Sequence, residues 1–297
     1  MRRLDSESGS DRVLIFIERV GPLATVQDLG RPGWFDSGVG QAGAADRASL
    51  RLANRLVGNP EELAAIEVLL GGLALRADAH LTVAVTGAPA PATVDGTPVG
   101  HASVLELAEG QVLRLGLALS GLRSYVAVRG GIDVPKVLGS RSRDTLSGIG
   151  PEPLRTGTQL PVGPPPRTLP TVEFAPVPVP PEVLTVRALP GPRAEWFTDP
   201  GELFRGSWVV STDTDRIGAR LDRADGPPLG RAITRELPAE GVALGSVQVP
   251  PSGQPVVFLA DHPITGGYPV IAVVLDADVD RVAQARPGER LRFVLAR

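Results

Sequence analysis

Glycine and proline interrupt this chain at short intervals, with 35 glycines and 30 prolines among 297 residues. Such a share would suggest low complexity, but short apolar runs separate these residues along most of the chain. Short apolar runs that alternate with turn-forming residues are typical of β-sheet proteins. We therefore expect a mainly β fold of the barrel or sandwich class.

The apolar runs predict where the strands lie. In the first half, the candidate strands are 13–18, 81–86, 104–107, 112–115 and 125–129. In the second half, they are 183–188, 208–211, 242–249, 256–260, 270–275 and 291–295. Helical spacing of apolar residues predicts short helices at 45–57 and 278–285, which end before Gly58-Asn59-Pro60 and Pro287-Gly288.

A proline-rich stretch divides the chain. Nine prolines lie from Pro161 to Pro181, and because proline cannot donate a ladder hydrogen bond, they favour an extended, semi-rigid connector. Single hydrophobic cores usually stop growing near this chain length, which also favours two domains. We predict four parts: a loose N-terminal tail (1–12), a first β-barrel lobe (13–163), a linker (164–182) and a second β-barrel lobe (183–297).

The composition excludes several classes of protein. The chain has no cysteine, which excludes disulfides, thiolate metal sites and a cysteine nucleophile. Its net charge is -3 and Lys136 is its only lysine, so nucleic-acid binding is not expected. No apolar run approaches the roughly 20 residues that cross a bilayer, and the first residues do not form a secretory signal. We expect a cytoplasmic protein without a membrane segment.

Common cofactor motifs are absent or out of context. Residues 38–43 spell GxGxxG, but 31–37 has the sequence of a loop and no alternation of strands and helices follows, so a dinucleotide site is not expected. The sequence has no GxxxxGK[ST] motif, so this chain would not hold ATP in a P-loop. The spacing of His80, His101 and His262 fits no zinc signature, and we expect no metal site.

One histidine follows directly on an apolar strand. Asp261 and His262 come after the run 256–260, and Tyr268 follows a glycine turn a few residues later. A neighbouring carboxylate can orient an imidazole for acid or base catalysis near neutral pH. Alternatively, Asp261 caps a turn and His262 is solvated, and the sequence leaves both possibilities open. His80 and His101 lie beside turns and are expected at the surface.

Other polar residues are candidates for holding a substrate. Arg216 and Arg220 can bind a carboxylate or phosphate through two parallel hydrogen bonds, although surface ion pairs are the alternative. Gln27 and Asp28 lie beside a glycine and an arginine and have a similar character. Gln248 could present its amide from a strand.

Several phrases, in order along the chain, resemble one known family. They are 25–31 (TVQDLGR), 52–59 (LANRLVGN), 125–131 (YVAVRGG), 137–141 (VLGSR), 215–221 (DRIGARL), 247–250 (VQVP) and 266–269 (GGYP). From about Val20 to Phe293, the chain is similar to the allophanate hydrolase subunit 2 family. That family includes the C subunit of prokaryotic 5-oxoprolinase, the carboxyltransferase region of urea carboxylase and an antagonist of a sporulation kinase inhibitor. Ile217 and Ala239 depart from the methionine and serine that are common in it.

The resemblance implies a fold, a reaction and partners. The fold would be two cyclophilin-like β-barrel lobes with a few short helices. The chain would pair with a homologue of subunit 1, the B subunit, and with a larger A subunit. The reaction would be ATP-driven opening of 5-oxo-L-proline to L-glutamate, with ATP bound with or by the partners. Met1 is the only methionine, so the methionine-flanked lysine that carries biotin is absent and no biotin is expected on this chain.

These residues combine into a hypothesis about the site. A cleft between the lobes would hold the substrate, Asp261 and His262 would assist proton transfer, and Arg216 or Arg220 would hold a carboxylate or acyl phosphate. The rest of the polar lining would come from Gln27, Asp28, Gln248 and Tyr268. Two alternatives stay open: a non-catalytic regulatory partner of a subunit 1 or kinase-inhibitor homologue, and a carboxyltransferase component that needs a separate biotinylated protein.

Overall fold

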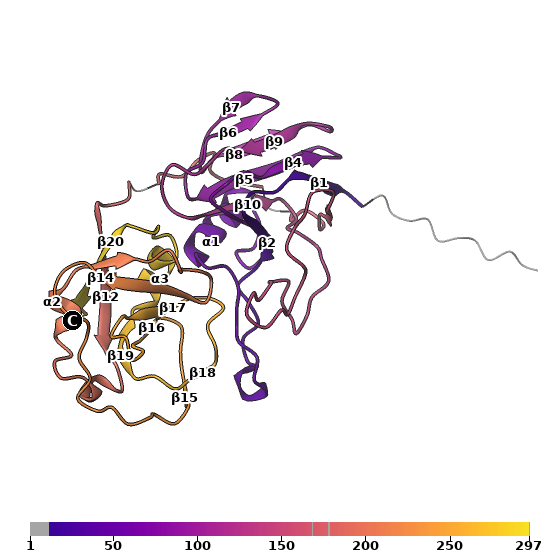
Figure 1. Cartoon of the computed structure of the whole chain (residues 1–297). Helices are drawn as coiled ribbons and strands as arrows, with labels where there is room; N and C mark the ends of the chain where they lie inside the picture. The colour runs from indigo at the N-terminus through magenta and orange to yellow at the C-terminus, as the bar shows by residue number, and fades with distance from the viewer. Residues whose placement is uncertain (1–11, 168, 178, 297) are drawn as a thin grey trace, which may run out of the picture.

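The computed structural model describes residues 12–167, 169–177 and 179–296. The tail expected at 1–12 therefore lies outside the described residues, apart from Arg12. The described chain is mainly β, as the spacing of glycine and proline predicts, with a few short helices. Figure 1 shows the strands of the first half gathered in one lobe and those of the second half in another.

The N-terminal lobe consists of two antiparallel sheets and one helix. In spatial order, the six-stranded sheet contains β11 (Gln159–Pro161), β1 (Leu14–Arg19), β4 (Ala74–Ala77), β9 (Val112–Leu115), β6 (Ala92–Val94) and β7 (Thr97–Val99). The five-stranded sheet contains β2 (Leu23–Gln27), β3 (Ala65–Leu69), β10 (Arg123–Val128), β5 (Leu81–Gly87) and β8 (Val104–Leu107). This lobe is therefore a sandwich of two open sheets, which differs from the closed barrel expected for it.

Side-chain alternation explains how the sandwich is held together. Val83 of β5 and Val126 of β10 point into the core that the two sheets share. Their neighbours Ala84 and Tyr125 point the other way and pack under α1 (Arg47–Leu56). Because both faces of the five-stranded sheet are covered in this way, the middle strand β10 is buried along its whole length.

The C-terminal lobe is a closed barrel, as predicted. Its strands, in spatial order, are β12 (Val183–Pro190), β19 (Val270–Val274), β16 (Ser246–Gln248), β17 (Val256–Phe258), β14 (Gly218–Arg223), β13 (Trp208–Val210) and β20 (Arg290–Leu295). The parallel pairing of β12 with β20 closes the barrel around a core that contains Trp208 and Phe293. A ribbon of β15 (Glu240–Gly241) and β18 (Thr265–Gly266) and the short helices η2 (Ala194–Trp196), α2 (Glu202–Arg205) and α3 (Asp276–Val282) complete the lobe.

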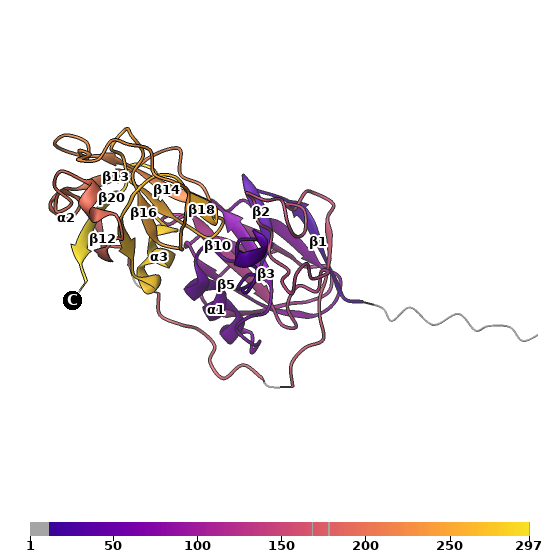
Figure 2. The ribbon, with the colours of Figure 1, turned by 90° about the horizontal axis from the view of Figure 1, so that it is seen from below.

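The proline-rich segment lies between β11 and β12, and its described residues form no helix. Figure 2 shows the described parts of this segment on the outside of the lobes. Part of it is attached to the N-terminal lobe, since Val104 N donates to Glu173 O (2.8 Å) and Ala175 N donates to Ala102 O (2.8 Å). The domain boundaries at 163/164 and 182/183 stay a prediction.

The two lobes contact each other where α1 begins and α3 ends. Gln284 Nε2 donates to Asp46 Oδ2 (2.7 Å), and Gln284 Oε1 accepts from the backbone N–H groups of Leu122 and Arg123. Asp46 also caps α1 by accepting from Ser49 N (2.9 Å). One glutamine of the C-terminal lobe thus satisfies backbone and side-chain groups of the other lobe.

Candidate functional site

A buried ion cluster joins the lobes at their centre. Arg216, just before β14, donates from Nε to Asp261 Oδ2 (2.8 Å) and from Nη2 to Asp261 Oδ1 (3.0 Å). Its Nη1 donates to Glu67 on β3, and its Nη2 also donates to Gly43 O (2.5 Å). Thr145 Oγ1 donates to Asp261 Oδ2 (2.6 Å). The cluster therefore links Arg216 and Asp261 of the barrel to three segments of the N-terminal lobe, which contribute Gly43, Glu67 and Thr145.

The electrostatics of this cluster favour its charged form. Burial lowers the pKa of Arg216, but the carboxylates of Glu67 and Asp261 outweigh this effect and raise the pKa well above its ordinary value. Tyr125 Oη donates to Glu67 Oε2 (2.7 Å), and burial together with the charge of Glu67 raises the pKa of this tyrosine. Arg216 is thus a permanent cation whose donors are mostly bound by protein acceptors.

A cavity of about 580 Å³ lies beside the cluster, between the lobes. We call it the His262 cavity. From the N-terminal lobe, its walls include Phe35, Asp36, Gln41, Ala42, Ala44, Ala45 and Arg47. From the C-terminal lobe, they include Gly241, Val242, Ala243, Leu244, Ala260, His262, Ile264, Thr265, Asp276 and Val279. It matches the expected cleft between the lobes in position, and its size suits a small metabolite.

The ring of His262 is held in one orientation on the wall of this cavity. It is stacked on Phe258, with 5.8 Å between the ring centroids, and its Nδ1 lies 2.8 Å from Pro263 O. Because a carbonyl oxygen only accepts, Nδ1 must carry the hydrogen, which leaves the lone pair of a neutral ring on Nε2. Burial lowers the pKa of His262, although Pro263 O and the charges of Asp261 and Asp144 act in the opposite direction. The imidazole is therefore a base that is neutral near pH 7.

A second cavity of about 640 Å³ lies between the lobes with Arg216 in its wall, and we call it the Arg123 cavity. Its polar walls include Glu67, Arg123, Thr145 and Arg216, and its apolar walls include Leu69. Arg123 is buried and donates to the backbone oxygens of Ala283 and Asp215. Residues of the ion cluster thus line the second cavity, whereas His262, the neighbour of Asp261, lines the first.

Two candidate residues of the first lobe serve its own structure. Asp28 Oδ1 accepts from Gly30 N (2.8 Å) and from Ser140 Oγ and Ser142 Oγ (both 2.6 Å). Gln27 Nε2 donates to Arg143 O (2.9 Å). Both residues therefore fasten the segment 140–143 to the end of β2, and neither lines either cavity.

Three candidate residues of the barrel also lie outside the two cavities. Gln248 is buried and donates from Nε2 to Tyr268 O (2.9 Å), so its amide links β16 to the turn before β19. The side chain of Tyr268 is exposed. Arg220 is exposed on β14 and donates to Asp213 O. Of the predicted residues, the structure brings Arg216, Asp261 and His262 together and places the others elsewhere.

Glu67, Thr145 and Arg123 belong to the site but were not among the sequence candidates. Glu67 had a visible signal, because it is the only charged residue in the apolar strand β3 (AIEVL), where an unpaired carboxylate would be costly. Thr145 and Arg123 had none, since their partners are distant in sequence. In the part of the chain that the structure describes, no group of three or more His, Asp or Glu residues could hold a metal ion. None of the helices described is long and apolar enough to cross a membrane.

The comparison with known proteins decides the family. The model of the carboxyltransferase domain, subdomains A and B, matches residues 37–295. The chain belongs to this carboxyltransferase domain family. The C subunit of 5-oxoprolinase from Escherichia coli (strain K12) is 40% identical to it over 289 residues, which cover 95% of this chain and 91% of that protein. The resemblance found in the sequence is thereby confirmed.

Two solved structures show the same carboxyltransferase domain within longer chains. The structure of TTHA0988 has a TM-score of 0.86 and 34% identity, and the match covers 96% of this chain and 57% of that chain. The structure of the K. lactis urea amidolyase has a TM-score of 0.90 and 27% identity, and the match covers 98% of this chain and 19% of that chain. The carboxyltransferase domain described here thus spans only part of either protein.

Proposed function

We propose that this chain is one subunit of an ATP-dependent hydrolase of the 5-oxoprolinase type, which opens the lactam of 5-oxo-L-proline to L-glutamate. The similarity to the 5-oxoprolinase C subunit over nearly the whole of both proteins supports the substrate class. The observation that carries the proposal is the neutral His262, with a lone pair on Nε2, on the wall of a cavity between the lobes.

The chemistry of lactam opening requires such a group. ATP held by the partners would transfer its terminal phosphoryl group to the lactam oxygen and release ADP. The water that attacks the activated carbon must lose a proton, the ring nitrogen must gain one as the C–N bond breaks, and a second water releases phosphate from the acyl phosphate that remains. A neutral imidazole accepts the first proton and, once protonated, can donate it to the leaving nitrogen. His262 is therefore the catalytic base of the proposal.

The ion cluster has a different role in this proposal. Asp261 is bound by Arg216 and Thr145 and is fully buried as a side chain, so it does not reach a substrate. It fixes the segment that carries His262, and Arg216 fixes Asp261. We therefore propose Asp261 and Arg216 as positioning residues. Arg220, Gln248, Gln27, Asp28 and Tyr268 are left out, because they do not line the cavity.

The residues of the two cavities do not by themselves fit a triphosphate. Arg47 in the His262 cavity donates to Asp276 and Asp280, and Arg123 and Arg286 in the Arg123 cavity donate to backbone oxygens. The charge of Arg47 is paired with two carboxylates, and most donors of Arg123 and Arg286 are already bound to backbone oxygens. We therefore place ATP with two partners: a homologue of subunit 1, the B subunit, and a larger A subunit. Because the reaction consumes ATP, we place the assembly in the cytoplasm.

The test is a reconstitution. The chain and its two partners, the B and A subunits, are purified and combined, and glutamate release from 5-oxo-L-proline is measured with and without ATP. Release should require ATP and all three proteins, and His262→Ala should reduce it by about 10²–10⁴-fold. The exposed His80 supplies a matched control, and His80→Ala should leave release unchanged. Release that is independent of ATP, or unchanged in His262→Ala, would refute the proposal.

A carboxyltransferase component of a urea carboxylase-like system is the second candidate. The family model and the superposition on the K. lactis urea amidolyase favour it. This function would need a separate biotinylated protein, so activity would require bicarbonate and would be blocked by avidin. Insensitivity to avidin together with glutamate release selects the hydrolase. A regulatory protein without chemistry would instead support partner binding while His262→Ala changes no turnover.

A further inference from the structure

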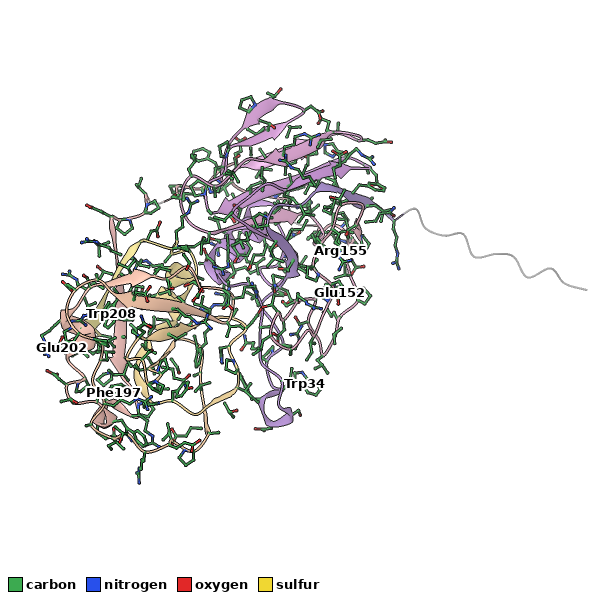
Figure 3. The ribbon with its side chains drawn as sticks, viewed as in Figure 1. Trp34, Glu152, Arg155, Phe197, Glu202 and Trp208 are labelled. Carbon is green, nitrogen blue, oxygen red and sulfur yellow. The ribbon has the colours of Figure 1, made fainter. Side chains whose placement is uncertain are left out.

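A protruding loop presents two large aromatic side chains to solvent. This loop, residues 31–40, is called the flap here, and its outer end is the short helix η1 (Phe35–Ser37). The side chains of Trp34 and Phe35 are 38% and 44% exposed. Figure 1 shows the flap reaching out from the N-terminal lobe, and Figure 3 shows Trp34 at its outer end. Adjacent exposed aromatic residues on a protrusion are typical of a protein interface.

The flap is rigid at its base, so it presents these side chains in a fixed place. Arg31 N donates to Gln41 O (2.8 Å), and the buried side chain of Arg31 donates to Ser142 O. Its tip is a closed turn, with Gly38 N donating to Phe35 O (2.9 Å). Rigid presentation lowers the entropy lost on binding, which favours a docking role.

The same tip forms one wall of the His262 cavity. Phe35 and Asp36 line this cavity opposite Val242 and Ile264 of the C-terminal lobe. Within the described residues, Asp36 has no hydrogen-bond or ion-pair partner. A protein that covers the flap therefore also narrows the entrance to the cavity that contains His262.

We propose that the flap docks into a partner protein and that this docking closes the His262 cavity. The partner is the chain homologous to the part of TTHA0988 that this chain does not cover. In TTHA0988 the match covers 57% of the chain, so the rest of that chain is joined covalently to the same fold and lies in its neighbourhood. The partner's surface should be an apolar pocket for Trp34 and Phe35 with a basic group near Asp36. This inference rests on the proposed function, because it concerns the same cavity.

Tryptophan fluorescence reports directly on the flap. Trp196 and Trp208 are 4% and 0% exposed, so quenching by acrylamide is dominated by Trp34. Adding the purified partner from the same organism should shift the emission to shorter wavelength and reduce quenching, and Trp34→Phe should abolish both changes. Unchanged quenching at a saturating partner concentration, or no complex at all, overturns the proposal. If the emission shifts and quenching falls in the same way when the chain alone is concentrated, the flap binds a second copy of this chain, and this result would also overturn the proposal.

Binding and turnover separate this inference from the proposed function. Trp34→Glu should weaken partner binding by about tenfold or more, because tryptophans at the centre of an interface contribute most of all residue types to the free energy of binding. Leu117 is exposed to 73% and is not near the cavity, so Leu117→Glu is the matched control and should change binding by less than about twofold. Equal binding of both variants refutes the docking, even if the assembly opens 5-oxo-L-proline. Weaker binding of Trp34→Glu in an assembly without lactam activity supports the docking and refutes the function. The melting temperature of each variant checks its fold.

Discussion

Arg216 of the barrel donates a hydrogen bond to Glu67 on β3, a residue 149 positions earlier in the chain, and both side chains are buried where the lobes meet. Asp261 balances the second side of the same guanidinium. A buried cation between two carboxylates is sensitive to the loss of any member, because each remaining charge then lies unpaired away from water. This cluster therefore fixes how the two lobes meet.

Removing the cation should be strongly destabilising. We expect Arg216→Ala to lower the free energy of unfolding by about 3–5 kcal/mol, because two buried carboxylates lose their partner. Arg220 lies on the same segment but is exposed, and Arg220→Ala should cost less than about 0.5 kcal/mol. Urea unfolding of both variants measures the difference. Equal midpoints would show that the cluster does not hold the lobes.

Replacing Gln284 should destabilise the protein by more than the loss of one hydrogen bond, because its side chain bonds several groups of the other lobe. Gln284→Ala removes one acceptor from two backbone N–H groups and one donor from Asp46. We expect a loss of about 2–4 kcal/mol, since each unsatisfied buried group costs about 1–3 kcal/mol. Gln254→Ala removes one exposed hydrogen bond to Asp222 and should be nearly neutral. Thermal unfolding compares them, and similar melting temperatures would contradict the interface described here.

Gly30, directly before the flap, and Gly33, within it, give a matched pair of substitutions. Both have positive φ angles, +86° at Gly30 and +89° at Gly33. A Cβ at Gly30 would lie 2.4 Å from Gln41 O, whereas a Cβ at Gly33 meets nothing within 4 Å. Gly33→Ala should therefore cost only the left-handed conformation, about 1–2 kcal/mol, and Gly30→Ala about 2–5 kcal/mol. If urea unfolding gives the same loss for both, the close approach at the flap base is absent.

Local signals predicted much of the fold. The glycine and proline at Gly58-Asn59-Pro60 end α1 close to the expected residue, and the strands at β8 and β9 have the expected bounds. The run 242–249 was expected as one strand, but Gly245 adopts φ +79° and only β16 remains after it. Strand β14 was missed because Arg220, Asp222 and Arg223 interrupt its apolar pattern. Whether a set of strands closes into a barrel depends on which strands pair, such as β12 with β20. The spacing of apolar runs along the chain does not show these pairings.

Local sequence signals likewise reveal some residues of the site and not others. His262 stands out in the sequence because it follows an apolar strand and an acid, and its catalytic role stays a prediction. The roles predicted for Arg216 depended on what surrounds it, and the sequence does not show that Glu67 and Asp261 occupy its donors. The polar-glycine phrases around Asp28 are as typical of a structural loop as of a binding site, and here Asp28 binds Ser140 and Ser142. Long-range partners therefore decide the function of a polar residue.

If His262 is a neutral catalytic base, turnover must depend on its protonation state, and the pH dependence of glutamate release measures this. Burial lowers the pKa of His262 below the ordinary value of 6.5, and in the proposed mechanism the neutral ring is the active form. Glutamate release by the full set of partners should therefore be complete at neutral pH and should fall only as the pH drops through the lowered pKa. In His262→Gln, the remaining release should have lost this acid limb. An acid limb that persists unchanged in His262→Gln, with full turnover above it, would contradict the account.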